Sequence, residues 1–165
     1  MKKIVAVSFF LLAVLRFINL GKIPIFIDEQ TYLRLGKTAI ENPDALFLSL
    51  KFLVFPVVPW TLGIFQLVFD PFLSPLYLGR LVMVIADFIS AFFIFQIGKK
   101  ILNQKYAVFS AIIYLTIPLN FFHSRLVLLE PITNMFFLAG FYYYLEIISS
   151  QKKIKVVKLA TKTLS

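Results

Sequence analysis

The sequence contains no cysteine and only one histidine, His123. Without cysteine the chain has no disulfide, no thiolate metal site and no cysteine nucleophile. A single histidine does not form a histidine metal cluster by itself. The sequence therefore predicts no cofactor, and it leaves open whether a divalent metal ion is needed.

Acidic residues are also scarce, because only eight residues of 165 are Asp or Glu, against 17 Lys or Arg. Sixty per cent of the residues are hydrophobic, whereas an ordinary soluble domain is about half apolar. The apolar residues form long runs, and the basic residues lie mostly at the ends of these runs. This pattern predicts an all-α fold, a polytopic transmembrane helical bundle, and it argues against nucleic acid as a partner.

Four apolar runs have a length suited to crossing a membrane, which requires ~20 helical residues. We expect residues 1–150 to form the transmembrane part and residues 151–165 a basic cytoplasmic tail. Arg16 lies near the far end of the first run, so we expect its side chain to reach the interface. Asp87 lies inside the second run and fits either a structural contact or a substrate contact. The predicted spans are about 4–20, 77–97, 106–122 and 132–148.

The connection at 29–69, after the first run, is less regular. Asp28 is a good N-cap for a helix over 29–41, which is too short to span and suits the membrane surface. Residues 47–69 are apolar but are interrupted by prolines and by Gly63. They either cross the membrane or form a juxtamembrane or re-entrant segment.

The distribution of basic residues decides between these alternatives. If 47–69 crosses, four Lys or Arg side chains lie inside and twelve outside. If it does not cross, ten lie inside and six outside, which agrees with the positive-inside bias. The N-terminus is then cytoplasmic and the Asp28 loop external, with Arg80 and the stretch 123–130 on the same side. Because three stretches bring ionisable residues to one membrane face, we expect a shared polar cavity at the outer leaflet.

A carboxylate close to an arginine at the outer leaflet suits a reaction on an anionic lipid. Arginine holds a phosphate through charge-assisted hydrogen bonds, and a carboxylate can take a proton from an attacking hydroxyl. The sequence has no glycine-rich phosphate loop of the kind used for soluble nucleotides. A donor that arrives within the bilayer does not require one.

Four stretches, in this order along the chain, resemble the N-terminal part of the GT-C class of membrane glycosyltransferases. The resemblance is to the protein mannosyltransferase and aminoarabinose transferase relatives of family 39 type. Glu130 stands where the family usually has Asp. The four stretches are Asp28-Glu29 followed by Tyr32, the segment 56–69, Leu78-Gly79-Arg80-Leu81, and Ser124-Arg125 continuing to Glu130-Pro131.

The resemblance implies transfer of a sugar from a polyprenyl-phosphate-linked donor to an acceptor at the outer face of the membrane. It implies that Asp28 is the catalytic carboxylate, with Glu29 beside it in the site. It further implies that Arg80, Arg125 and Glu130 bind the lipid phosphate, with membrane lipid around them. The alternative is a non-enzymatic polytopic membrane subunit that serves transport or scaffolding.

Relatives of this type are longer and have more spans. We therefore expect a truncated or partial copy, or a chain that works with a partner carrying the missing C-terminal spans. On either basis we expect the purified chain 1–165 to be inactive alone.

Overall fold

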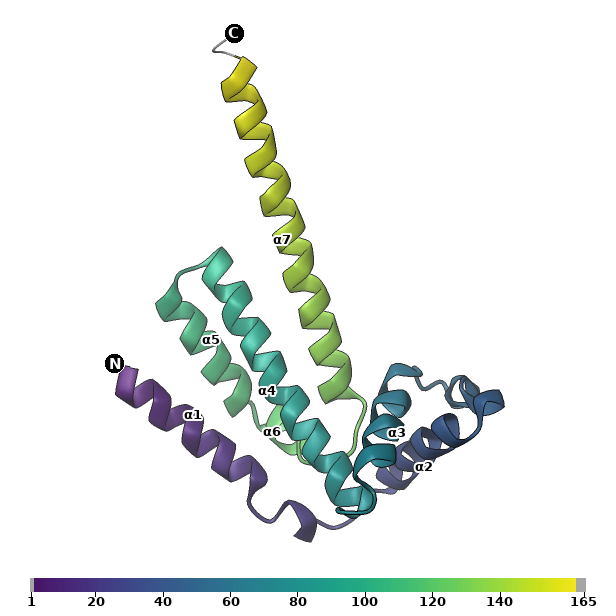
Figure 1. Ribbon diagram of the computed structural model, residues 1–165. Coiled ribbons are helices and arrows are strands. Elements are labelled where there is room, and N and C mark those ends of the chain that lie inside the picture. The colour runs from purple at the N-terminus through teal and green to yellow at the C-terminus, as the bar shows by residue number, and fades with distance from the viewer. Residues whose placement is uncertain (1, 163–165) are drawn as a thin grey trace.

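A computed structural model describes residues 2–162, and the side chains of residues 7–42 and 44–151. Within these residues every regular element is a helix, which confirms the all-α prediction (Figure 1). Three 3₁₀ helices are short: η1 (Leu20–Lys22), η2 (Pro43–Ala45) and η3 (Leu48–Phe52). The α-helices are α1 (Lys2–Phe17), α2 (Ile27–Glu41), α3 (Val57–Phe69), α4 (Pro75–Ile101), α5 (Gln104–Thr116), α6 (Pro118–His123) and α7 (Glu130–Lys162).

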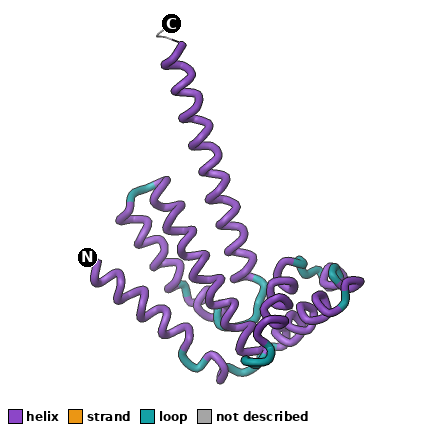
Figure 2. The backbone as a smooth tube through the Cα atoms, in the orientation of Figure 1, coloured by secondary structure: helices purple, strands orange, loops and turns teal. Residues whose placement is uncertain are grey.

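Helix α4 lies at the centre of the fold and packs against α5 on one side and α7 on the other (Figure 1). Helix α1 lies beside α5 and α4, and α7 continues beyond the other helices towards the C-terminus (Figure 2). Helices α2 and α3 pack against each other at the end of the bundle where α1 ends and where α4 and α7 begin. We call this end the site end.

Helix α4 has 27 residues and is the one helix in the described part that is by itself long and apolar enough to cross a membrane. The segments Val7–Lys22 and Ile27–Glu41 pass the same test together, but they are bent by 87° relative to each other. Helices α2 and α3 have 15 and 13 residues. Both are shorter than the ~20 residues of a straight span. The four-span arrangement and its orientation therefore stay predictions.

The predicted span 106–122 is interrupted. Helix α5 ends at Thr116, Ile117 has ψ 120°, and Pro118 begins α6. Proline has no N–H to continue the helical hydrogen bonds, and it disfavours the α conformation of the residue before it. The break turns the chain at the site end before α7 begins.

Two glycines allow α2 and α3 to approach each other backbone to backbone. A Cβ atom on Gly63 would clash with the carbonyl oxygen of Gly36. Beside this contact, the buried Gln66 side chain donates to the Leu33 carbonyl at 3.1 Å. The helix pair is thus a tightly packed unit that fixes where the start of α2 lies.

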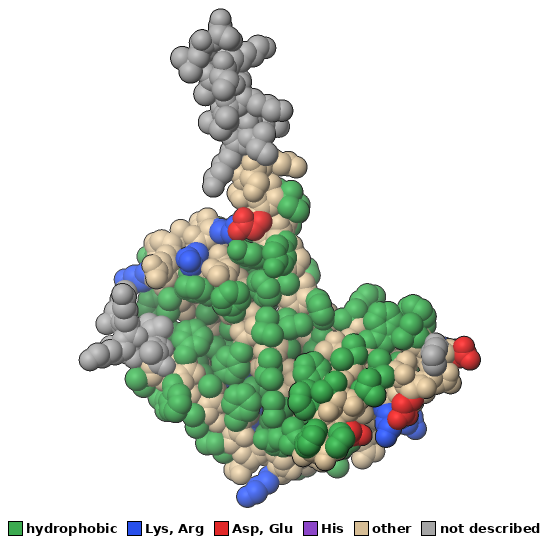
Figure 3. All heavy atoms as spheres, viewed as in Figure 1, with side chains coloured by type: hydrophobic (Ala, Val, Ile, Leu, Met, Phe, Trp, Pro, Cys, Tyr) green, Lys and Arg blue, Asp and Glu red, His purple; other side chains and the backbone are tan. Residues whose placement is uncertain are grey.

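Hydrophobic side chains cover much of the face seen in Figure 3, and charged side chains lie mainly at the margins of that face. Phe10 of α1, Leu67 of α3 and Phe137 of α7 are each 67–70% exposed. Soluble proteins rarely expose apolar surface on this scale, whereas it suits contact with lipid.

The predicted basic tail continues α7 as far as Lys162. Residues 163–165, and the side chains of 152–162, lie outside the described part of the chain. The tail's role as a cytoplasmic anchor stays a prediction.

Candidate functional site

A fully buried ion pair between Glu29 of α2 and Arg80 of α4 forms the centre of the site end. Two Arg80 nitrogens, Nε and Nη2, donate to the two Glu29 carboxylate oxygens at 2.8 and 2.7 Å. This bidentate arrangement is the geometry in which arginine and carboxylate interact most strongly. It joins two helices whose residues are 51 positions apart.

The Glu29 carboxylate also accepts two backbone hydrogen bonds. The N–H of Val127 donates to Oε1 and the N–H of Phe26 donates to Oε2, both at 2.8 Å. Each oxygen therefore accepts two hydrogen bonds. Burial alone would raise the pKa of Glu29, but Arg80 and the two N–H donors outweigh it and hold the pKa below its usual value. Glu29 is thus a carboxylate that is ionised and fully engaged by the protein.

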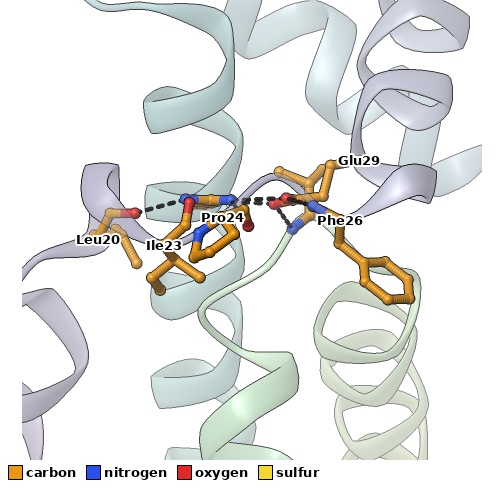
Figure 4. Close-up of polar contacts among 7 residues, drawn as sticks. Leu20, Ile23, Pro24, Phe26 and Glu29 are labelled. Atoms are coloured by element: carbon orange, nitrogen blue, oxygen red, sulfur yellow. Dashed lines mark hydrogen bonds and ion pairs between the residues drawn. The ribbon is translucent and has the colours of Figure 1, made fainter.

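Arg80 is equally engaged. Its Nη1 donates to the carbonyls of Leu20 and Ile23 at 2.8 and 2.9 Å, and its Nη2 donates to Pro24 at 3.1 Å (Figure 4). With the two bonds to Glu29, these contacts occupy all five N–H groups of a guanidinium. The sequence predicts that Arg80 binds phosphate, but in this structure it has no free donor for that purpose.

The N-terminus of α2 differs from the prediction that Asp28 is the N-cap. The helix begins at Ile27 with Phe26 as N-cap, and Glu29 bonds back to the Phe26 N–H. A glutamate at the third helical position is well placed for this return bond. Asp28 is left half-buried in the first turn, and no hydrogen bond or ion pair to its carboxylate occurs in the described part.

Tyr32 interacts electrostatically with two carboxylates, Asp28 of α2 and Glu130 of α7. It lies one helical turn after Asp28 and packs against the hydrophobic core. Burial raises the pKa of Tyr32, and the carboxylates of Asp28 and Glu130 raise it further. Both carboxylates therefore lie close enough to the Tyr32 phenol to raise its pKa. Glu130 is exposed at the start of α7 and lies 3.6 Å from Nδ1 of His123.

Arg125 differs from Arg80 in having donors to spare. Its Nη2 donates to the Ile18 carbonyl at 2.6 Å, while its Nε is buried and has no hydrogen-bond partner among the described residues. Burial lowers the pKa of Arg125, and the nearby Arg16 and Arg80 lower it further. Each of these two arginines is paired with a carboxylate, but no ion pair to Arg125 occurs among the described side chains. Of the three arginines, Arg125 is therefore the one without a carboxylate partner among the described side chains.

A second buried ion pair, between Arg16 and Asp87, corrects one prediction. Arg16 does not reach the interface; it is fully buried, and its Nε donates to Asp87 Oδ2 at 2.9 Å. The physical reason is that a partner carboxylate within the bundle satisfies the charge without water. Of the two interpretations of Asp87, the structural contact is the one observed. Two opposite charges inside apolar runs were the signal in the sequence for this pair.

Two clefts in the described part lie next to α3. One of about 380 Å³ lies between α3 and the start of α7, lined by Val58, Ile132 and Phe136 among others. Another of about 190 Å³ lies between α2 and α3, near Lys37 and Asp70. Neither is lined by Asp28 or Arg125, so the shared polar cavity stays a prediction. No group of three metal-ligating side chains is present in the part of the chain described.

Comparison with protein families gives a match over residues 54–161, to the dolichyl-phosphate-mannose-protein mannosyltransferase family. The chain belongs to this family. Comparisons with curated proteins and with solved structures gave no match. The matched region contains Arg80, Arg125 and Glu130, and Asp28 and Glu29 precede it.

Membership of this mannosyltransferase family confirms the resemblance drawn from the sequence. The family points to glycosyltransferase activity with polyprenyl-phosphate-linked sugar donors in a membrane. The long apolar helix α4 agrees with a membrane protein.

Proposed function

We propose that this chain contributes the sugar-transfer site of a membrane glycosyltransferase that acts at the outer face of the membrane. The donor is a sugar linked to a polyprenyl phosphate, and the acceptor presents a hydroxyl group. The observation that carries the proposal is the contrast between two adjacent carboxylates. Glu29 accepts four hydrogen bonds from the protein, whereas the half-buried Asp28 at the same helix terminus has no hydrogen bond or ion pair in the part of the chain that is described.

Asp28 acts as the general base in this proposal. The acceptor oxygen attacks the anomeric carbon of the donor, and a new carbon–oxygen bond forms as the bond from that carbon to the phosphate oxygen breaks. The hydroxyl proton passes to the Asp28 carboxylate, and the polyprenyl phosphate leaves with the bonding electrons. A positioned base of this kind contributes about 10²–10⁴-fold to a reaction rate.

Arg125 binds the phosphate as it leaves. The leaving phosphate gains negative charge, and a cation with unused N–H donors stabilises that charge. Glu130 lies five residues further along the same segment and acts with Asp28 on Tyr32. We assign Glu130 to the side of the site that contacts the donor, as the family resemblance implies.

Glu29 and Arg80 are positioning residues in this account. Their pair holds the start of α2, the segment 20–24 and the backbone at Val127 together. Asp28 belongs to the first of these elements, and Arg125 lies two residues before Val127. The pair therefore sets the distance between Asp28 and Arg125, and it does so without contacting either substrate.

The alternative of a transport or scaffold subunit requires polar groups that are free to contact a transported species. Two buried charged side chains that lie within the predicted spans, Arg16 and Asp87, are instead paired with each other. This pairing favours the enzyme over a transport path.

The donor class tests the proposal. Membranes of the native host in which the chain is overproduced supply any partner chain and the natural acceptor. We expect faster release of polyprenyl phosphate from a labelled polyprenyl-phosphate sugar than in membranes lacking the chain. Equal rates in the two membranes, or transfer from a nucleotide sugar when no polyprenyl-phosphate sugar is present, would contradict it.

A further inference from the structure

The Arg125 side chain donates a hydrogen bond to the backbone just after the end of α1, at the Ile18 carbonyl. We propose that Arg16 and Asp87 are positioning residues that hold Arg125 in place for binding the phosphate of the lipid donor. The inference rests on the proposed function. It extends the site to two residues that lie within predicted spans and contact neither the donor nor the acceptor.

The first step is the attachment of α1 to the bundle. Arg16 lies in the last turn of α1, and its Nε donates to Asp87 of α4 at 2.9 Å. Its Nη2 donates to the Leu115 carbonyl of α5, also at 2.9 Å. Elsewhere α1 presents large apolar side chains to the surroundings, including Phe10 and Leu11. The buried pair is therefore the main polar link that fixes the end of this helix.

The second step leads from Arg16 to Arg125. Ile18 follows Arg16 by two residues, and its carbonyl accepts the 2.6 Å hydrogen bond from Nη2 of Arg125. The guanidinium carbons of Arg16 and Arg125 also lie 5.1 and 5.3 Å from the ring centroid of Phe121. The two arginines thus share one backbone segment and one aromatic ring. Movement of Arg16 must change the surroundings of Arg125.

The direction in which phosphate affinity changes when Asp87 is neutralised distinguishes a positioning role from a purely electrostatic one. Asp87 is a negative charge near the arginines, so its neutralisation would tighten phosphate binding if it acted through charge alone. If Asp87 positions Arg125 through Arg16, its neutralisation releases the end of α1 and weakens phosphate binding. The two mechanisms predict changes in opposite directions.

The experiment measures binding of a short-chain polyprenyl monophosphate, and of the matching uncharged polyprenol, to the purified chain in detergent micelles. Native mass spectrometry gives both affinities. We expect Asp87→Asn to weaken phosphate binding about 10-fold and to leave polyprenol binding unchanged. Asp87→Glu, which retains a carboxylate, should recover most of the loss. Ser110→Ala, a change in α5 whose hydroxyl donates to the Tyr106 carbonyl of the same helix, should leave both affinities unchanged.

A second variant keeps the inference testable if the Asp87→Asn protein does not fold. Phe121→Leu removes the shared ring but keeps an apolar side chain, and we expect phosphate binding to weaken about 3-fold. Unchanged or tighter phosphate binding in both variants would overturn the inference. So would an equal loss of polyprenol binding, since that would mean general disruption.

Arg125→Ala separates this inference from the proposed function. If Arg125→Ala weakens phosphate binding and Asp87→Asn does not, only the positioning role fails. If Arg125→Ala has no effect, the phosphate role of Arg125 fails as well. In the Arg125→Ala background we expect Asp87→Asn to cause no further loss, because both changes act on the same contact.

Discussion

Arg80 and Glu29 are hydrogen-bonded to each other and to nearby backbone groups so completely that neither has a hydrogen-bonding position left for a substrate. The guanidinium gives all five of its N–H groups to protein acceptors, and the carboxylate accepts four hydrogen bonds. An Asp-Glu dipeptide therefore divides into two roles. The glutamate lies at the centre of a buried hydrogen-bond network, whereas the aspartate has no hydrogen bond or ion pair among the described residues.

Removing one partner of this pair should destabilise the protein strongly. Glu29→Gln leaves the buried Arg80 charge without compensation, and breaking a buried pair in this way costs about 3–5 kcal/mol. Thermal unfolding of the purified chain in detergent measures the change. Glu41→Gln is the control, because its contact with Lys37 is exposed and its loss should cost no more than about 0.5 kcal/mol. Similar melting temperatures for the two variants would be incompatible with the role given to Glu29.

The same pair should make stability depend on acidity. The folded pKa of Glu29 is lowered, so its stabilising contribution is fully present above the unfolded value near ~4.3. The contribution is lost as the pH falls below that value and through the folded pKa. Melting temperatures between pH 6 and pH 3 should therefore fall more steeply for the wild type than for Glu29→Gln. Parallel curves would show that this carboxylate does not carry the effect.

The contact between α2 and α3 should not tolerate a methyl group. Gly63→Ala places Cβ against the Gly36 backbone, which cannot move as a side chain can, and overpacking of this kind costs about 1–3 kcal/mol. Gly140→Ala is the matched control in α7, because a Cβ there meets nothing within 4 Å. Alanine should stabilise that position by up to ~1 kcal/mol, since glycine is a poor helix former. Thermal unfolding in detergent measures the stability of both variants. Equal stability of the two would contradict the close packing of α2 against α3.

Much of the fold could be predicted from the sequence. The long apolar runs placed both ends of α1 and α4 and the start of α7 to within four residues, and the Asn42-Pro43 stop gave the end of α2. Helix α7 continues to Lys162, beyond the predicted end of its span at 148. The prediction missed the break at Ile117 because apolar composition continues through it, although Pro118 was visible. It also named Asp28 as N-cap, because an aspartate favours that position when no later side chain competes. In the structure Glu29 provides the side chain that bonds back to the Phe26 N–H, and it accepts hydrogen bonds from Arg80 at the same time.

The site could be predicted as a set of residues but not as a set of roles. Charge bias and family resemblance named Asp28, Glu29, Arg80, Arg125 and Glu130 together. Nothing in their order along the chain shows which arginine is saturated and which has donors to spare. That difference depends on carbonyls of the segment 20–24, which converge on Arg80 only in three dimensions. The pairing of Arg16 with Asp87 depends likewise on the packing of α1 against α4.

The most direct test of the account compares Asp28→Asn with Asp44→Asn in the polyprenyl-phosphate release assay. Asp44 is an exposed aspartate in η2, outside the site, so its change should leave the rate unaltered. Asp28→Asn should lower the turnover rate at least about 100-fold, because the acceptor hydroxyl loses its base. Its melting temperature should stay close to the wild type, since the Asp28 carboxylate has no hydrogen bond or ion pair among the described residues to lose. Wild-type turnover by Asp28→Asn, in membranes where wild-type transfer is measurable, would contradict the central claim.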